Sequence, residues 1–358
     1  MREPWIDRAK GMLIVLVVFG HLVGTAGKLA TGSADCYNAL WKLVYLFHMP
    51  AFFVLAGVLW RRPLPPFRDF LVAKARHLMV PYYAFGAFSL AVYSLMTAFA
   101  PGCAGADGAY YAARTADSGF FLHLRTLLLA DGAIGGEGFK FNSVLWFLPC
   151  YFSTQVVFYA LNRLFRGSFA ALAVVSAALF AADRLGLCRP LACLPLELAA
   201  VPRYLVFVTL GTLVPVAPFA AGARPTRPRL VAEAVGALAL YFAFALLAPS
   251  YHELLFTPAG AFASLPLAVM GTMALLLAAI ALPSRLFASL GAASLWIMML
   301  HRFALSALQL KLPGVAVLYR DAPLAVSLAV SSVILAVTVA GCVFARAAAT
   351  RLLKEVGK

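Results

Sequence analysis

Charged side chains are scarce in this chain. Asp, Glu, Lys and Arg together make up 12% of its 358 residues, whereas 63% of the residues are hydrophobic. Soluble domains carry about a quarter charged and about half apolar residues, so the composition excludes an ordinary soluble domain. It also excludes a disordered chain, which needs low hydrophobicity. With six cysteines in this length, a disulfide-dense mini-protein is excluded as well.

Signatures of several kinds of site are also missing. The histidines are scattered, with no H-E-x-x-H motif and no cysteine–histidine spacing, so we expect no metal. No G-x-S-x-G motif indicates a serine nucleophile. The net charge of +15 would suggest nucleic acid in a hydrophilic chain. Here the basic residues fall between long apolar runs and are typical of membrane topology signals, so we expect no nucleic-acid partner.

Long apolar runs dominate what is present. Several exceed the roughly 20 residues that cross a hydrocarbon core about 30 Å thick. Ten runs contain no Asp, Glu, Lys or Arg: 11–27, 43–60, 78–106, 141–162, 167–182, 204–223, 234–251, 254–284, 286–300 and 322–345. A transmembrane β-barrel would show short alternating segments instead. The sequence therefore predicts an all-α polytopic membrane protein with about ten transmembrane helices.

The basic residues predict the orientation of these helices. With the N-terminus in the cytoplasm, the inner segments hold 18 of the 29 Lys and Arg residues, which leaves 29 − 18 = 11 outside. This excess favours both termini in the cytoplasm. We expect a multi-pass protein of the cell (inner) membrane with a transmembrane domain over 5–345 and a basic cytoplasmic tail over 346–358. Glu3, Asp7 and His21 argue against a cleaved signal peptide at the first helix.

Ionisable residues inside apolar spans are costly and usually face an interior cavity. Three of them, Asp7, Lys10 and His21, lie on one stripe of the first helix. Lys10 and His21 are eleven residues apart, which is a residual rotation of about 20° and an axial separation of about 16 Å. A cation at the inner mouth can hold a phosphate-rich donor, and a deep imidazole can accept a proton. The alternatives are a positive-inside anchor at Lys10 and a histidine bonded to a neighbouring helix.

The cysteines give a separate prediction. Cys36, Cys103, Cys188 and Cys193 all fall in the predicted outer segments, whereas Cys150 and Cys342 lie within spans. Four outer cysteines allow three disulfide pairings, and an oxidising compartment would permit such bonds. The alternative is that they are small apolar residues.

Four motifs, in order along the chain, carry a resemblance to a known family. They are WIDRAKGMLIVLVVFGH at 5–21, FHMPAFFVLAG at 47–57, LWFLP at 145–149 and SLWIMMLH at 294–301. This set resembles the membrane acyltransferase-3 family, whose first helix carries a basic residue and a histidine at the spacing of Lys10 and His21. The opening is most similar to the branch that includes the fucose 4-O-acetylases.

The resemblance implies a function. Such enzymes take an acyl group, usually acetyl, from cytoplasmic acyl-CoA (acetyl-CoA) and pass it to a hydroxyl of a glycan or lipid-linked saccharide at the outer face. It implies helices around a central cavity and His21 as catalytic base or transient acyl carrier. Lys74 and Arg76, with Arg61 and Arg62 nearby, would bind the CoA phosphates. His77 stands where the family often has an arginine.

Further polar residues are candidates for contact with the acceptor. His48, before Met49-Pro50, either contacts substrate or satisfies a carbonyl freed by the proline. His301, followed by Arg302 near the outer end of its span, faces the acceptor, or the pair snorkels to the interface. We add Trp146 and Asn142 as sugar contacts, although Trp146 also fits an interfacial belt. Arg203 would pair with an acidic sugar or with Glu197. His123 and His252 fit surface positions.

A transporter or flippase for a lipid-linked glycan is the alternative function. It would use the same intramembrane polar groups as a translocation path. Inverted repeats and paired broken helices would support it, and the sequence shows neither.

Overall fold

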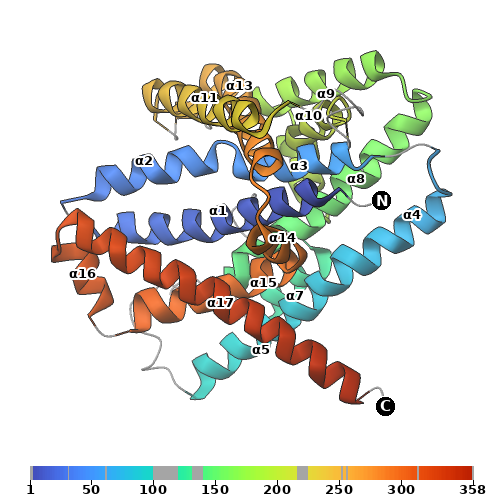
Figure 1. The fold of residues 1–358 in the computed structure, drawn as a ribbon. Coiled ribbons are helices and arrows are strands. Elements are labelled where there is room, and N and C mark those ends of the chain that lie inside the picture. Colours follow the sequence, from blue (N-terminus) through green and yellow to red (C-terminus); the bar gives the residue numbers. More distant parts are fainter. Residues whose placement is uncertain are drawn as a thin grey trace. The chain divides into compact units, whose positions relative to one another are not determined.

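The computed structural model describes residues 3–30, 32–60, 63–99, 120–130, 140–215, 225–250, 253–254, 257–312 and 314–356. Within those residues every regular element is a helix (Figure 1), which confirms the all-α prediction. The chain divides into two compact units, which are described separately. Unit 1 comprises Met1–Phe52 and Val216–Lys358, and unit 2 comprises Phe53–Pro215.

Unit 1 is built around its first helix, α1 (Pro4–Leu29). A helix that is hydrophobic on all sides is stable when neighbours cover it, and Ile6, Leu13 and Leu22 are fully buried. The helices that contact α1 are α2 (Ala34–Tyr45), α13 (Pro258–Ala281), α14 (Arg285–Ala292), α15 (Ser294–Ser306), α16 (Val315–Asp321) and α17 (Leu324–Val356). α11 (Arg227–Leu247) packs on α13 and α2. The predicted acid–base stripe therefore runs through the middle of this unit.

Unit 2 contains the middle of the chain. Its elements are α4 (Phe67–Lys74), the π-helix η1 (Ala75–Met79), α5 (Val80–Phe99), α7 (Phe120–Leu129), η4 (Lys140–Trp146), α8 (Phe147–Leu164), α9 (Phe169–Arg184), η5 (Arg189–Cys193), η6 (Leu198–Ala200) and α10 (Val201–Gly211). α10 packs against α8 and α9. α3 (His48–Val58) begins in unit 1 and ends in unit 2, where Phe53 stacks on Tyr204 with ring centroids 4.3 Å apart.

Six helical segments are long and apolar enough to cross a membrane. They are Pro4–Leu29, Ala34–Val58, Asn142–Leu164, Arg227–Leu247, Phe262–Ala281 and Leu324–Arg351. A seventh span results if α14 and α15, which meet at an angle of 81°, are counted together. A multi-pass membrane protein is thus confirmed. All ten predicted apolar runs contain helices, but α9 with 16 residues and α10 with 11 are shorter than a full crossing.

Two predicted spans are interrupted. The run 43–60 contains the end of α2 and all of α3, separated at Leu46 and Phe47. Pro50 explains this break, because it has no N–H to continue the hydrogen-bond ladder to Leu46. The run 286–300, which the sequence predicts as part of a single span, is divided between α14 and α15. It bends at Ala293, whose φ of −97° and ψ of −1° lie outside the regular helix.

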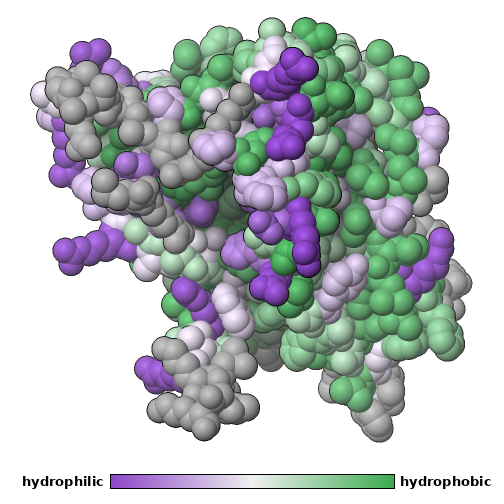
Figure 2. All heavy atoms as spheres, turned by 90° about the vertical axis from the view of Figure 1, so that its right-hand side faces the viewer, coloured by the Kyte–Doolittle hydropathy of each residue, from purple (hydrophilic) through white to green (hydrophobic). Residues whose placement is uncertain are grey.

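The outer helices of the molecule expose apolar side chains. Only 22% of the spanning window is buried in α11, and the same share in α17. Leu247 is 85% exposed and Phe344 75% exposed. On the face drawn in Figure 2, hydrophobic residues form broad continuous areas while hydrophilic residues gather in separate groups. In a membrane, lipid tails cover exposed apolar areas of this kind.

Candidate active site

Glycines bring α14 close to the N-terminal half of α1. A Cβ atom on Gly11 would overlap the carbonyl oxygen of Phe287, and a Cβ on Gly291 would overlap that of Asp7. The two backbones are therefore in direct contact, as small residues permit between membrane helices. This contact fixes the part of α1 that carries Asp7 and Lys10.

Glycines also allow α2 to pack closely against α1 near His21. A Cβ on Gly20 would lie 2.8 Å from ring atom Cε2 of Tyr45, and one on Gly24 would lie 3.0 Å from Trp41. Because α2 comes this close, the hydroxyl oxygen of Tyr45 lies 3.1 Å from Nδ1 of His21. The imidazole is thus held by a phenol from the neighbouring helix. His21 itself is partly exposed.

Two further imidazoles surround this pair. The ring centroid of His301 lies 5.2 Å from that of His21, and the ring of His48 lies 4.7 Å from that of Tyr45. His301 is 0% and His48 2% exposed. Three histidines and a tyrosine from α1, α2, α3 and α15 therefore form one cluster within unit 1, which we call the histidine cluster (His21, Tyr45, His48 and His301).

The tautomers of the two buried histidines follow from their hydrogen bonds. Nδ1 of His48 lies 2.9 Å from the carbonyl oxygen of Val44, and Nδ1 of His301 lies 2.9 Å from that of Ile297. A carbonyl only accepts, so Nδ1 carries the proton in both rings. In the neutral ring Nε2 then offers a lone pair. The Nε2 atom of His301 is buried and has no hydrogen-bond partner among the described residues.

Asp7 and Lys10 form the polar end of the same helix. The Lys10 Nζ and an Asp7 carboxylate oxygen are 3.9 Å apart, with side chains 26% and 17% exposed. The spacing of eleven residues places Lys10 about 16 Å from His21 along the axis. The structure thus keeps the predicted stripe on one helix.

The predicted donor-binding residues lie in unit 2. Lys74 donates a 2.6 Å hydrogen bond to the amide oxygen of Gln155 and sits 5.5 Å from the ring centroid of Phe70. Arg76 and His77 are exposed on the π-helix η1. Such π segments often occur at functional sites, and nothing in the residue pattern indicates this one. Arg61 and Arg62 lie outside the described residues.

Two residues of unit 2 that are predicted to contact the sugar, Asn142 and Trp146, contact other residues of the protein. Asn142 is fully buried, and its Nδ2 atom donates to the Ser89 hydroxyl over 3.3 Å. The partly exposed Trp146 lies beside Tyr204, with ring centroids 6.0 Å apart.

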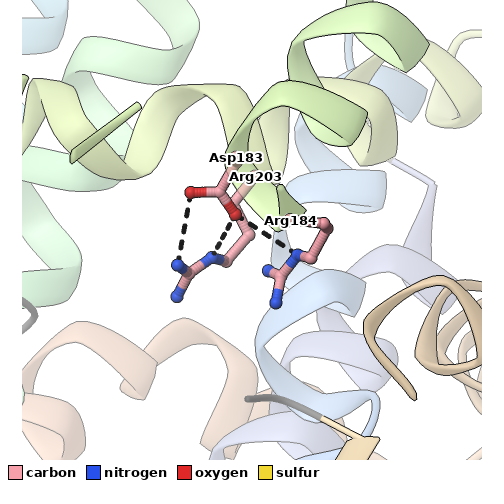
Figure 3. A network of polar contacts seen from close by, with 3 residues as sticks. All are labelled: Asp183, Arg184 and Arg203. Atoms are coloured by element: carbon pink, nitrogen blue, oxygen red, sulfur yellow. Dashed lines mark hydrogen bonds and ion pairs between the residues drawn. The ribbon is translucent and has the colours of Figure 1, made fainter. Parts of the chain in front are cut away.

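Arg203 belongs to a compact ion-pair network (Figure 3). Its Nε and Nη2 atoms donate to the two carboxylate oxygens of Asp183 at 3.0 and 3.3 Å. Arg184 approaches the same carboxylate, with its Nε atom 3.2 Å from Oδ2. Sequence analysis did not single out Asp183, because an Asp-Arg pair at the end of an apolar run resembles an ordinary helix terminus.

Other expectations have clear outcomes. His123, expected at the surface, is 2% exposed on α7, because the apolar face of that helix packs against α5; the surface prediction is wrong.

His252 and Cys103 lie outside the described residues. Cys36 and Cys188 carry free thiols, so neither forms a disulfide. Within the described ranges no group of three or more His, Cys, Asp or Glu residues is placed to hold a metal.

Together these features define a class of protein: a multi-pass membrane protein with a cluster of imidazoles buried between its helices. The sequence model described as an acyltransferase domain, that of the acyltransferase-3 family, matches residues 3–346. The match covers nearly the whole chain, so the protein belongs to this family and the predicted resemblance is confirmed. Comparisons with curated proteins and with solved structures found no match. The protein is therefore a membrane acyltransferase that uses an acyl donor and an acceptor, and a transporter without acyl transfer is set aside.

Proposed function

We propose that the protein transfers an acyl group, usually acetyl, from cytoplasmic acyl-CoA to a hydroxyl of a cell-surface or exported glycan, as in the fucose 4-O-acetylase branch. One observation carries this proposal: His21, partly open and held by Tyr45, lies on the central helix of unit 1 in an acyltransferase. An imidazole that is oriented by a hydrogen bond and partly exposed is suited to general-base catalysis. A glycan supplies the hydroxyls that such a base activates.

In the proposed step, Nδ1–H of His21 donates to the Tyr45 oxygen, which leaves Nε2 as the base. Nε2 takes the proton of the acceptor hydroxyl while the hydroxyl oxygen attacks the thioester carbonyl carbon. The C–S bond then breaks, and the thiolate of CoA takes the proton back from the imidazolium. An oriented base of this kind contributes about 10²- to 10⁴-fold to the rate. The phenol performs the orienting role that a carboxylate has in other histidine pairs.

We also propose where the donor binds. Lys10, steadied by Asp7, provides a cation about 16 Å along α1 from the base. A thioester donor is elongated, with phosphates at one end and the acyl group at the other, so this separation suits it. Lys74 and Arg76 are the proposed phosphate contacts in unit 2, since Arg76 is exposed and Lys74 is held in place by Gln155.

For the acceptor we propose His301 and His48 as contacts, because both belong to the histidine cluster. Trp146, with a partly exposed ring, stays a proposed sugar contact in unit 2. The hydrogen bonds of Asn142 to Ser89 and of Arg203 to Asp183 favour roles in fixing helices.

The proposed topology has ten spans with both termini in the cytoplasm. It adds α5, α9 and α10 to the seven spans above, counting α14 and α15 as one. The excess of basic residues in the inner segments supports this orientation. Both short helices, α9 and α10, would reach a full crossing with the residues that flank them.

The test is acceptor-dependent release of CoA from the purified protein in lipid nanodiscs, followed with a thiol reagent. We expect turnover with acetyl-CoA and a saccharide acceptor, and a loss of at least about 100-fold in kcat for His21→Gln. His123→Gln is the matched control, since it alters a buried histidine outside the histidine cluster. Unchanged turnover in a folded His21→Gln protein would contradict the base assignment.

A further inference from the structure

Helix α15 carries three polar groups that the protein leaves unsatisfied. Nε2 of His301, Nε of Arg302 and Oγ of Ser306 are buried and have no hydrogen-bond partner in the part of the chain that the structure describes. Arg302 and Ser306 are four residues apart and share one face of the helix, and His301 adjoins Arg302. Buried polar groups in proteins are almost always paired, so three together point to a missing partner.

Each group needs a partner of a defined kind. Because Nδ1 of His301 donates to the carbonyl of Ile297, its Nε2 atom in the neutral ring requires a donor. Arg302 carries a positive charge and its Nε–H requires an acceptor. Ser306 can take either role. A ligand with hydroxyl groups and an anionic group satisfies all three.

Among the described residues, Arg302 has no acidic partner. The ion pairs of acidic residues in unit 1 are made with other cations: Asp7 with Lys10, Glu233 with Arg229, and Asp321 with Arg320. Among the described residues no carboxylate pairs with Arg302. It nevertheless lies close enough to act electrostatically on His21, Tyr45 and His301. A guanidinium nitrogen that is buried without an acceptor is costly, and such a group is usually kept for function.

We propose that His301, Arg302 and Ser306 bind an acidic acceptor, a saccharide that carries a carboxylate or phosphate beside its hydroxyls. This inference rests on the proposed function and names its substrate class. Arg302 binds the anionic group, since a guanidinium matches carboxylate and phosphate oxygens geometrically. His301 accepts a hydrogen bond from one hydroxyl. Because the His301 and His21 rings are 5.2 Å apart, a neighbouring hydroxyl then reaches the base.

The donor is the other possible source of an anion, but its proposed phosphate contact in unit 1 is Lys10. That residue lies about 16 Å from His21 along α1, whereas Arg302 is adjacent to the histidine cluster. The anion that reaches Arg302 therefore belongs to the molecule that meets the thioester end of the donor.

The test compares two probes that differ in one group, methyl glucuronide and methyl glucoside, with the full-length protein in nanodiscs. Binding is followed by the shift in melting temperature and transfer by CoA release. We expect the acidic sugar to stabilise the wild type and to be the better acceptor. Arg302→Gln should lose about 10- to 100-fold in kcat/KM for the acidic sugar, mainly through KM, and clearly less for the neutral one. Arg302→Lys should recover part of the loss.

Arg320→Gln is the matched control, because Arg320 is exposed and paired with Asp321. Without ligand, Arg302→Gln should melt no lower than the wild type, since it removes a guanidinium whose buried Nε atom has no hydrogen-bond partner among the described residues. A lower melting temperature, an equal loss with both sugars, or a raised KM for acetyl-CoA alone would overturn the proposal. If the wild type releases no CoA but the acidic sugar still stabilises it in an Arg302-dependent way, the proposed reaction fails and the binding site stands.

Discussion

The Tyr45 hydroxyl orients the imidazole of His21 through a hydrogen bond. It approaches Nδ1 to 3.1 Å from a neighbouring helix. Tyr45 is itself packed on Trp41, with ring centroids 4.4 Å apart. A rotating imidazole would spend little time with Nε2 toward the acceptor. Tyr45 is thus a positioning residue that acts through His21.

Replacing Tyr45 with Phe removes this hydroxyl and keeps the ring packing. We expect kcat to fall about tenfold or more, because one hydrogen bond to an ionising group is worth about 1.5–3 kcal/mol. The KM for acetyl-CoA should change little, since the change lies far from Lys10. Steady-state kinetics with acetyl-CoA varied at saturating acceptor measures both quantities.

Tyr83→Phe serves as the comparison, since it removes a hydroxyl that bonds only the backbone oxygen of Leu128. A Tyr45→Phe protein with wild-type kcat would show that the imidazole is held in another way.

At the residue scale the sequence predicts part of the site. Lys10 and His21 follow from helical periodicity and the cost of polar groups in a membrane. Tyr45 was missed because tyrosine is common in membrane helices, and only the close approach at Gly20 brings it to His21. Its place three residues before His48 on an apolar helix was the available signal. The Asp183 partner of Arg203 depends on a contact between helices that residue spacing does not encode.

At the scale of elements, the contact between α1 and α14 fixes the end of α1 that carries Asp7 and Lys10. Gly11 and Gly291 each face the other helix's backbone, so neither position has room for a methyl group. The backbones must separate when a side chain is introduced. In that case α1, which carries Lys10, moves away from α14.

Gly11→Ala should therefore destabilise the protein by about 1–3 kcal/mol, as overpacking usually does, although alanine is the better helix former by about 1 kcal/mol. Thermal unfolding in detergent measures the effect. Gly236→Ala on α11 is the control, because nothing lies within 4 Å of the added atom there. If both variants unfold at the wild-type temperature, α1 and α14 do not pack as tightly as described.

Helix breaks were harder to predict than helices. Every apolar run contains a helix among the residues that the structure describes, since each provides a long hydrophobic stretch. Pro50 indicates the break near α3, but the 81° bend at Ala293 occurs between residues with ordinary helix propensity. It is explained by tertiary packing: α14 must lie along α1, whereas α15 must bring His301 to His21.

At the scale of the whole molecule, composition alone predicts a polytopic helical protein, and motif order predicts its family. The number of membrane crossings depends on short helices such as α9 and α10, because their length alone does not show whether they cross the membrane. The proposed orientation in the membrane rests on the charge distribution, and it can be measured directly.

Orientation is tested with single cysteines in a variant whose other cysteines are replaced by serine. Cys36, a free thiol at the start of α2, should react with an impermeant maleimide in intact cells. Arg285→Cys, at the exposed start of α14, should react only after permeabilisation. Labelling of both residues from the same side would contradict the proposed topology, and the reverse pattern would invert it.

The last helix has a consequence for the choice of lipid. α17 runs for 33 residues without a break and includes most of the predicted basic tail. At 1.5 Å per residue it measures about 50 Å, against a hydrocarbon core of about 30 Å. If the bilayer became a few ångströms thicker, its hydrocarbon core would simply cover more of α17. The 16-residue α9 has no extra length beyond the hydrocarbon core. Long-chain phospholipids should therefore strain unit 2 well before they affect the C-terminal helix.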